Sequence, residues 1–223
     1  MKIYYARTDA LVKESMFSRA LKMLPDSRLE KLSRIKPDTA RIQCVAAGIL
    51  LEIGLRDYSI CGKNVTFLKN SDGKPYILEY PNLHYNLSHS GEYVALVMAD
   101  CAVGIDIEKV RYGQERLVKR FFSKEEAECL LESFSDLAFT KTWTRKEAFI
   151  KAKGIGMRMP LAGFSTITDV VKLNEEMPEE MQTEIITYYL NSYQINEEYC
   201  ISVCQEVYEL TDTPVEIKIE NFL

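Results

Sequence analysis

The order of apolar and polar positions along the chain predicts an alternation of β-strands and α-helices. Two apolar runs, at residues 93–99 and 101–105, indicate strands that turn near Asp100. Other short apolar or alternating stretches predict strands at residues 1–5, 65–68, 83–87, 164–167, 184–190, 199–205 and 215–219. Strands are therefore expected in both the first and the second part of the chain.

Helical periodicity predicts longer elements between these strands. Apolar positions three and four residues apart indicate helices at residues 17–24 and 38–55, and two further helices are expected at residues 125–134 and 136–153. Asp38 can cap the second of them. Ser123 and Glu126 have the spacing of a capping box at the start of the third. The fourth is expected to end before Gly154, because glycine commonly follows the last turn of a helix.

The strand around residues 104–108 carries the first candidate chemistry. Side chains alternate along a strand, so Asp106 and Glu108 project the same way, roughly 6 to 7 Å apart, while Ile105 and Ile107 point into the core. Two carboxylates at one strand end form half of a hard-oxygen site for Mg²⁺. The alternative is a solvated strand edge, and a third ligand together with an anionic substrate site would favour the metal site.

A third carboxylate lies in the predicted helix at residues 136–153. Trp143, Glu147 and Lys151 follow one another at a spacing of four, which places an indole, a carboxylate and an ammonium in one column. The structural alternative is a salt bridge between Glu147 and Lys151 within the helix, which contributes roughly a few tenths of a kcal/mol. The spacing alone leaves both interpretations open.

Several basic side chains precede these carboxylates. Arg28, Lys31 and Arg34 fall on one face of a short helical stretch, where they could grip a phosphate or simply face solvent. Arg41 lies in the first turn of its helix, so it is either a surface residue or lies beside an anion. His89, flanked by two serines at a predicted strand-to-strand turn, could donate to a phosphate or serve as a turn residue.

Composition and charge narrow the classes of function. The chain has 223 residues, 47% of them hydrophobic, and can bury a core unaided. Its net charge is −5, yet residues 13–41, 109–124 and 141–158 are rich in lysine and arginine. Basic segments in an acidic protein predict a polyanionic ligand, an acidic partner or both. They do not indicate a nucleic-acid binder, because no basic motif is interleaved with aromatic residues.

The cysteines and the apolar runs bear on location. Six cysteines form no CxxC or Cys/His cluster, so we expect reduced, buried thiols and no zinc site. No apolar run approaches the roughly 18 to 20 residues that span a bilayer. The N-terminal residues resemble a strand and lack the features of a signal peptide. We therefore expect a cytoplasmic protein with no membrane partner.

Four motifs occur in order along the chain: Asn86-Leu-Ser-His-Ser-Gly91, Gly104-Ile-Asp-Ile-Glu108, Phe121-Phe-Ser-Lys-Glu-Glu126 and Trp143-Thr-Arg-Lys-Glu-Ala-Phe-Ile-Lys-Ala-Lys-Gly-Ile-Gly156. Together they resemble the 4′-phosphopantetheinyl transferases of the surfactin-synthetase-activating (Sfp) type. The resemblance extends from the basic region near Arg28 to Gly156 and weakens in the last sixty or so residues.

The resemblance implies an activity and a site. Members of that family move the phosphopantetheine arm of coenzyme A (CoA) to a serine hydroxyl of an acyl or peptidyl carrier protein and release adenosine 3′,5′-bisphosphate. Asp106, Glu108 and Glu147 resemble the carboxylates that hold Mg²⁺ against the CoA pyrophosphate. Lys151 resembles the lysine that contacts a pyrophosphate oxygen. Glu147 is also a candidate for accepting the serine proton.

The resemblance assigns the remaining CoA contacts to the first part of the chain. His89 and Arg41 resemble binders of the 3′-phosphate. Arg28, Lys31 and Arg34 compete for two further positions at that phosphate, and we assign these positions to Arg28 and Lys31. The turn Gly73-Lys74-Pro75 resembles the one that packs on the adenine, so Lys74 and Pro75 are candidate CoA contacts. Ser88 resembles a contact on the phosphate side.

The implied fold is α+β, with two similar α/β halves related by a pseudo-two-fold axis and CoA in the cleft between them. The halves would be residues 1–102, which contact the 3′-phosphate and adenine, and residues 103–223, which carry the Mg²⁺ site. A chain holding both halves is expected to be a monomer. The acidic carrier would dock on residues 109–124, where Phe121 and Phe122 offer apolar contact unless they belong to the core, as we expect for at least one.

Two other functions fit the same residues. A non-catalytic CoA-binding or carrier-binding protein of the same fold would be expected to lack a metal ligand or the lysine. The chain has all four of these residues, namely Asp106, Glu108, Glu147 and Lys151. A hydrolase that uses the same Mg²⁺ site with water as nucleophile would need no carrier surface.

Overall fold

The computed structural model describes residues 1–175, 184–208 and 213–223. The strands are β1 (Lys2–Arg7), β2 (Phe67–Lys69), β3 (Pro75–Ile77), β4 (His84–Ser90), β5 (Tyr93–Ala99), β6 (Val103–Lys109), β7 (Val170–Glu175), β8 (Glu184–Asn196), β9 (Tyr199–Gln205) and β10 (Val215–Glu216). The α-helices are α1 (Glu14–Leu21), α2 (Asp26–Ser33), α3 (Asp38–Arg56), α4 (Glu115–Phe121), α5 (Lys124–Glu132) and α6 (Asp136–Lys153).

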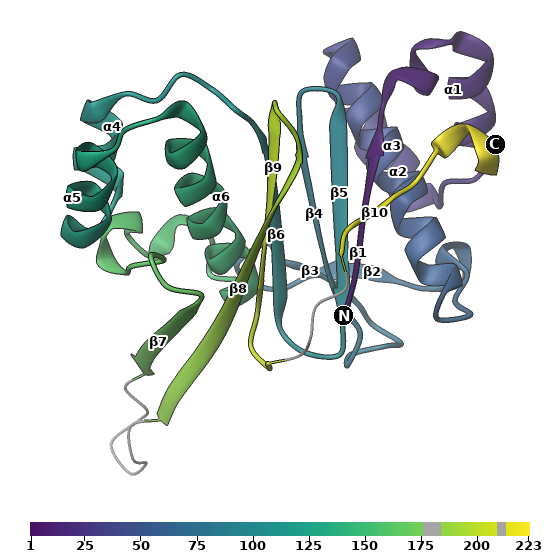
Figure 1. The fold of residues 1–223 in the computed structure, drawn as a ribbon. Helices are drawn as coiled ribbons and strands as arrows, with labels where there is room; N and C mark the ends of the chain where they lie inside the picture. The colour runs from purple at the N-terminus through teal and green to yellow at the C-terminus, as the bar shows by residue number, and fades with distance from the viewer. Residues whose placement is uncertain (176–183, 209–212) are drawn as a thin grey trace.

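Two sheets form the centre of the molecule, and helices cover their outer faces (Figure 1). One sheet has the order β10-β1-β5-β4 and the other the order β6-β9-β8-β7. Apolar side chains of both sheets, among them Ile3, Val97, Ile105 and Ile201, pack together between the sheets. The long helix α3 packs on the first sheet and α6 on the second, which confirms the expected α+β class.

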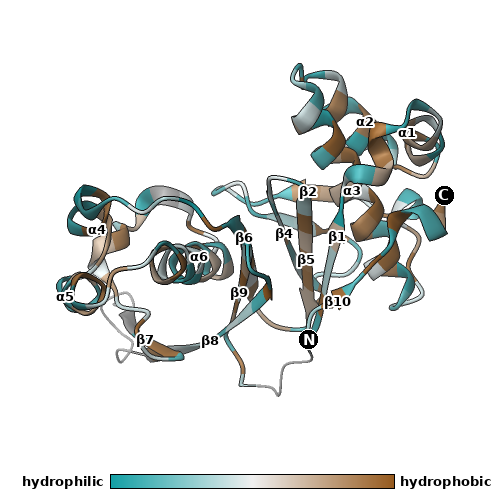
Figure 2. Cartoon of the chain, turned by 45° about the horizontal axis from the view of Figure 1, so that its top comes forward, coloured by the Kyte–Doolittle hydropathy of each residue, from teal (hydrophilic) through white to brown (hydrophobic). Residues whose placement is uncertain are grey.

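The helix α3 is buried on nearly all sides over its second half. Every residue from Cys44 to Leu55 is buried, because the first sheet lies on one side and the small helices α1 and α2 on the other. Figure 2 shows the hydrophobic colouring along α3 and β5. The predicted cap was wrong: Pro37 takes the N-cap position and Asp38 is the first helical residue, where its charge still favours the helix dipole.

The chain passes from the first sheet to the second between Ala99 and Val103, close to the expected boundary after residue 102. The C-terminal segment then returns to the first sheet. β10 pairs in parallel with β1, and the 3₁₀ turn at Ile219–Phe222 packs against the helices of that side (Figure 1). Residues 103–223 are therefore not one continuous unit in space.

The predicted strand at residues 164–167 does not form. Side chains bind its backbone instead, because Thr166 N donates to Glu126 and Thr166 O accepts from Arg145. The strand in this region is β7, a few residues later, which the apolar pattern did not predict. The apolar pattern likewise did not predict β3. The acidic stretch at residues 175–180, which the sequence indicates as a loop, lies outside the described residues after Glu175.

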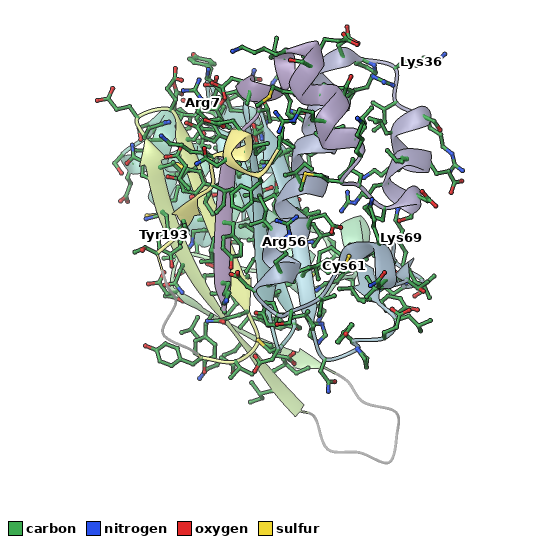
Figure 3. All side chains as sticks on the ribbon, turned by 90° about the vertical axis from the view of Figure 1, so that its right-hand side faces the viewer. Arg7, Lys36, Arg56, Cys61, Lys69 and Tyr193 are labelled. Carbon is green, nitrogen blue, oxygen red and sulfur yellow. The ribbon has the colours of Figure 1, made fainter. Side chains whose placement is uncertain are left out.

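The cysteines are less uniformly buried than expected. Cys44, Cys200 and Cys204 are buried, whereas Cys61 and Cys129 are exposed. Figure 3 labels Cys61 on the outer face of the first half, near Arg56. Burial raises the pKa of the Cys204 and Cys200 thiols, so both are held in the protonated form. Within the part of the chain that the structure describes, no helix is long and apolar enough to cross a membrane.

Candidate active site

A pocket of about 350 Å³ opens where β4, β6 and α6 meet. It is lined by Leu87, Ser88, His89, Asp106, Glu108, Arg111, Trp143, Glu147 and Lys151. All three carboxylates and the lysine singled out in the sequence therefore surround one cavity. The column on α6 faces this pocket rather than open solvent.

Close packing of α6 against β6 positions the pocket. A Cβ atom at Gly104 would lie 2.2 Å from Ala148 O and 2.3 Å from Ala152 N, so only glycine lets the helix backbone approach the strand this closely. The alternation predicted for β6 is confirmed: Ile105 and Ile107 are fully buried between the sheets, and Asp106 and Glu108 face the pocket. Asp106 is itself buried, with 4% of its surface exposed.

Lys151 binds Asp106 in this structure. Its Nζ lies 2.6 Å from Asp106 Oδ1 and 3.1 Å from Ser88 Oγ. In the described part of the chain Lys151 makes no ion pair with Glu147, so the alternative of a salt bridge within the helix is not the one that forms. The other oxygen of Asp106, Oδ2, is buried and has no hydrogen-bond partner among the described residues. A buried acceptor without a partner costs free energy and marks a place for a ligand.

The surroundings of the other two carboxylates, Glu108 and Glu147, disfavour their ionised forms. Burial raises the pKa of Glu147, and the neighbouring charge of Asp106 raises it further. Burial also raises the pKa of Glu108, against the effect of a hydrogen bond from Ser90. Arg111 offers partial compensation, with its Nη2 3.7 Å from Glu108 and its guanidinium over the Trp143 ring.

These residues fit a hard divalent cation that completes its shell with outside ligands. Among the described residues, no group of three or more His, Cys, Asp or Glu side chains is arranged in this structure to hold a metal ion. Mg²⁺ does not require one, because it is commonly bound by one or two carboxylates, substrate phosphate and water. The unpartnered Asp106 Oδ2 and the desolvated Glu108 and Glu147 provide the negative oxygens that such an ion needs.

Among the basic residues that the sequence singled out in the first half, His89 lines this pocket. His89 is exposed on β4, rather than in the predicted turn, because that strand continues to Ser90. Burial of part of the ring and then the charges of Lys151 and Lys31 lower its pKa. Desolvation, followed by the charge of Arg28, lowers the pKa of Lys31. Lys31 is thus close enough to both His89 and Arg28 for their charges to interact, and the lowered pKa disfavours the charged form of His89 itself.

Two other predicted phosphate binders have protein partners. Arg34 forms an exposed ion pair with Glu30 on its own helix. Arg41 is half-buried, and its Nη1 donates to Ile35 O at 3.4 Å. Arg34 therefore has an acidic partner on its own helix, and the choice of Arg28 and Lys31 as the two phosphate binders stays a prediction.

The turn before β3 contacts the second half directly. Lys74 Nζ donates to Ala152 O at 2.6 Å and to Val103 O at 3.1 Å, and burial lowers its pKa to about 8. Asp72, in the same turn, forms an ion pair with Arg158. The ammonium of Lys74 is thus bound to one backbone carbonyl at the end of α6 and one at the start of β6, a role that the sequence did not predict. Pro75 begins β3.

The predicted docking segment at residues 109–124 is partly core and partly surface. Phe122 has 3% of its surface exposed, and Phe121 packs edge-on against Trp143 with ring centroids 5.9 Å apart. This confirms that at least one of the two phenylalanines belongs to the core. Tyr112 is the most exposed aromatic residue described in this segment, at 80%.

Sequence reasoning did not single out two polar residues in or next to the pocket. Arg111 lines it, and Ser90 donates to Glu108 Oε2 at 2.8 Å. Ser90 could have been found by alternation, since it lies two residues after Ser88 just as Glu108 lies two residues after Asp106. Nothing in the local sequence distinguishes Arg111 from the other cations of its basic segment.

Comparison with known proteins gives a consistent result. Residues 102–204 match the family model described as the 4′-phosphopantetheinyl transferase superfamily. The chain is 30% identical over 210 residues to a 4′-phosphopantetheinyl transferase of Bacillus subtilis and to the 4′-phosphopantetheinyl transferase Sfp of Bacillus subtilis strain 168, with 92% of each chain covered in both comparisons.

Among solved structures, holo-[acyl-carrier-protein] synthase of Thermotoga maritima matches with a TM-score of 0.30 and 21% identity, over 47% of this chain and 61% of that one. The relatives aligned over nearly their whole length are decisive, and they agree with the family that the four sequence motifs resemble. The chain belongs to the 4′-phosphopantetheinyl transferase family.

Proposed function

We propose that this protein transfers the 4′-phosphopantetheine arm of CoA to a serine hydroxyl of an acyl or peptidyl carrier protein. The serine oxygen attacks the β-phosphorus of the CoA pyrophosphate, the bond from that phosphorus to the bridging oxygen breaks, and adenosine 3′,5′-bisphosphate leaves. The observation that carries the proposal is the single pocket in which Asp106, Glu108, Glu147 and Lys151 meet, in a member of this family.

We assign Mg²⁺ binding to Asp106, Glu108 and Glu147. When bound, the ion would neutralise charge that develops on the phosphate oxygens. Support comes from the unpartnered Asp106 Oδ2 and from the raised pKa values of Glu108 and Glu147, because all three features are relieved by a nearby cation.

Lys151 and Glu147 are assigned to the transfer itself. The Lys151 ammonium would contact a pyrophosphate oxygen, for which it must exchange at least part of its present contact with Asp106. Glu147 would accept the serine proton, directly or through water. This role requires an anion close to the nucleophile, and Glu147 lines the same pocket as Lys151.

The two parts of the chain would divide the binding of CoA. Residues 1–102 would hold the 3′-phosphate through Arg28, Lys31, Arg41 and His89, and the adenine against the turn of Lys74 and Pro75. Residues 103–223, apart from the C-terminal segment that joins the first sheet, would supply the metal site. CoA would then lie in the cleft between the halves.

The carrier protein would dock beside the pocket on residues 109–124. This segment combines cations with the exposed ring of Tyr112, and such a surface suits an acidic partner helix. We further propose that the protein acts as a monomer in the cytoplasm.

The test is the intact mass of an apo carrier protein after incubation with this protein, CoA and Mg²⁺. Parallel reactions contain EDTA or the Asp106→Ala variant. We expect one phosphopantetheine group on the carrier, absent from both controls. Unchanged mass for acyl and peptidyl carriers alike, despite measurable CoA binding, would instead favour a non-catalytic CoA-binding protein. Consumption of CoA without carrier modification would favour a hydrolase.

A further inference from the structure

Polar side chains join the two central sheets along β4 and β6. Each of these strands lies at the edge of its sheet, and the two edges face one another. Asn86, Ser88 and Ser90 are two residues apart on β4 and therefore point the same way. Their side-chain oxygens accept hydrogen bonds from successive backbone N–H groups of β6, those of Ile105 at 3.0 Å, Ile107 at 3.3 Å and Lys109 at 3.1 Å.

Only the two serines also reach the carboxylates. Ser88 Oγ donates to Asp106 Oδ1 at 2.8 Å, and Ser90 Oγ donates to Glu108 Oε2 at 2.8 Å. A serine hydroxyl has one proton to donate and lone pairs to accept with. Because the backbone N–H of β6 occupies the accepting side, the proton of each serine is directed at the carboxylate. Asn86 makes the backbone contact alone.

We propose that Ser90 is a positioning residue that orients Glu108 for the divalent cation, as Ser88 does for Asp106. The proposal rests on the function proposed above. Ser90 holds Oε2 of Glu108, which directs the other oxygen, Oε1, toward Arg111 and the pocket. Ser88 holds Oδ1 of Asp106 and leaves Oδ2 without a partner.

This arrangement makes the metal site a property of the contact between the two halves. The serines come from a strand of the first sheet, whereas the carboxylates come from a strand of the second. Partners that orient metal ligands in this way contribute strongly to affinity, and their removal costs about 10- to 100-fold in metal binding or activity. The hydroxyl of Ser90 is thus expected to act on the cation without touching it.

The test compares Ser90→Ala with Ser90→Thr and Asn86→Ala. Mn²⁺ binding is measured from the electron paramagnetic resonance signal of the free ion, with CoA present at saturation and no carrier. We expect Ser90→Ala to weaken Mn²⁺ binding about 10-fold and Ser90→Thr to restore most of it, because threonine keeps the hydroxyl. Asn86→Ala also removes a hydrogen bond between a β4 side chain and the β6 backbone, but it removes no contact with a carboxylate. The Mn²⁺ affinity of this variant should therefore match that of the unaltered protein, even if its unfolding midpoint falls.

Two results would overturn the inference. One is unchanged Mn²⁺ affinity in Ser90→Ala. The other is an equal loss of Mn²⁺ affinity in Ser90→Ala and Asn86→Ala, which would mean that the contact between β4 and β6 as a whole, and not the Ser90 hydroxyl, determines the affinity. Absence of Mn²⁺ binding by the unaltered protein would contradict the metal role in the proposed function itself. Carrier modification by the unaltered protein, measured alongside, separates these failures.

Discussion

The buried ion pair between Lys146 and Glu126 allows a quantitative prediction. Lys146 precedes Glu147 on α6 but points to the other side of the helix, where both partners have fully buried side chains and Nζ lies 2.6 Å from Glu126 Oε2. The ammonium also donates to Leu161 O at 2.7 Å and Phe164 O at 2.6 Å. The pair thus connects α5, α6 and the segment before β7.

Replacement of Lys146 by methionine keeps the length of the side chain and removes its charge. Glu126 then remains buried as an uncompensated carboxylate, although it retains hydrogen bonds from Ser123 N and from Thr166. Breaking a buried pair in this way costs about 3 to 5 kcal/mol, and the remaining hydrogen bonds favour the lower value. With an m-value of about 3 kcal/mol per M, the urea midpoint should fall by about 1 M.

The assay is urea unfolding followed by the fluorescence of Trp143, the single tryptophan of the chain, which lies on the same helix. Lys124→Met, which removes an exposed ion pair with Glu128, is the matched control and should leave the midpoint unchanged. Addition of Glu126→Gln to Lys146→Met should cost less than the sum of the single changes, because it removes the unpaired charge. An unchanged midpoint for Lys146→Met, or strict additivity in the double variant, would refute the reasoning.

Three further predictions concern the pocket. Glu147→Gln should abolish carrier modification at pH 7 without lowering the thermal unfolding midpoint. The midpoint is unaffected because burial and the charge of Asp106 already disfavour the ionised form of the Glu147 carboxylate. Retained activity would exclude Glu147 from the metal and base roles. Without metal, the raised pKa values of Glu108 and Glu147 mean that the folded state binds protons more tightly than the unfolded state. Their contribution to the free energy of unfolding should therefore be greatest below the unfolded pKa of about 4.5 and fall as the pH rises through the raised folded values. Urea unfolding of the Glu108→Gln/Glu147→Gln variant should show no such fall, and a parallel pH dependence in both proteins would contradict it. The pKa of His89 lies below the ordinary value in the free protein and should rise once adenosine 3′,5′-bisphosphate binds, because a phosphate favours the imidazolium. The pKa is measured by nuclear magnetic resonance, and a His84→Gln variant assigns the His89 signal. An unchanged pKa would remove His89 from the phosphate site.

The sequence predicts best those elements whose signals are local. The helix at residues 136–153 and the strand at residues 199–205 have the predicted bounds. The capping box of Ser123 and Glu126 and the left-handed Gly154 at the end of α6 also form as expected, because each depends on residues within one turn.

Features that depend on distant residues were not predictable in the same way. The contacts of Lys74 with Ala152 and Val103, and the pairing of β10 with β1, each join segments far apart in the chain. The strand expected at residues 164–167 fails for a similar reason, because Glu126 and Arg145 bind its backbone. Periodicity reports which side of an element is buried but not what it is buried against.

The candidate site lies between these extremes. Alternation and helical spacing correctly placed Asp106 with Glu108 on one face and Glu147 with Lys151 on another, and the four-motif resemblance placed both faces at one pocket. The local pattern could not predict that Lys151 binds Asp106 instead of Glu147, since this depends on how closely α6 packs on β6 at Gly104.

The most direct test of the metal site is the anomalous scattering of Mn²⁺ in crystals of the protein grown with CoA. The account predicts one strong peak in the pocket of Asp106, Glu108 and Glu147, in contact with the CoA pyrophosphate, and a Lys151 ammonium that has moved from Asp106 toward a phosphate oxygen. A CoA pyrophosphate bound elsewhere, or bound with Lys151 still on Asp106 and no metal peak beside it, would contradict the central claim.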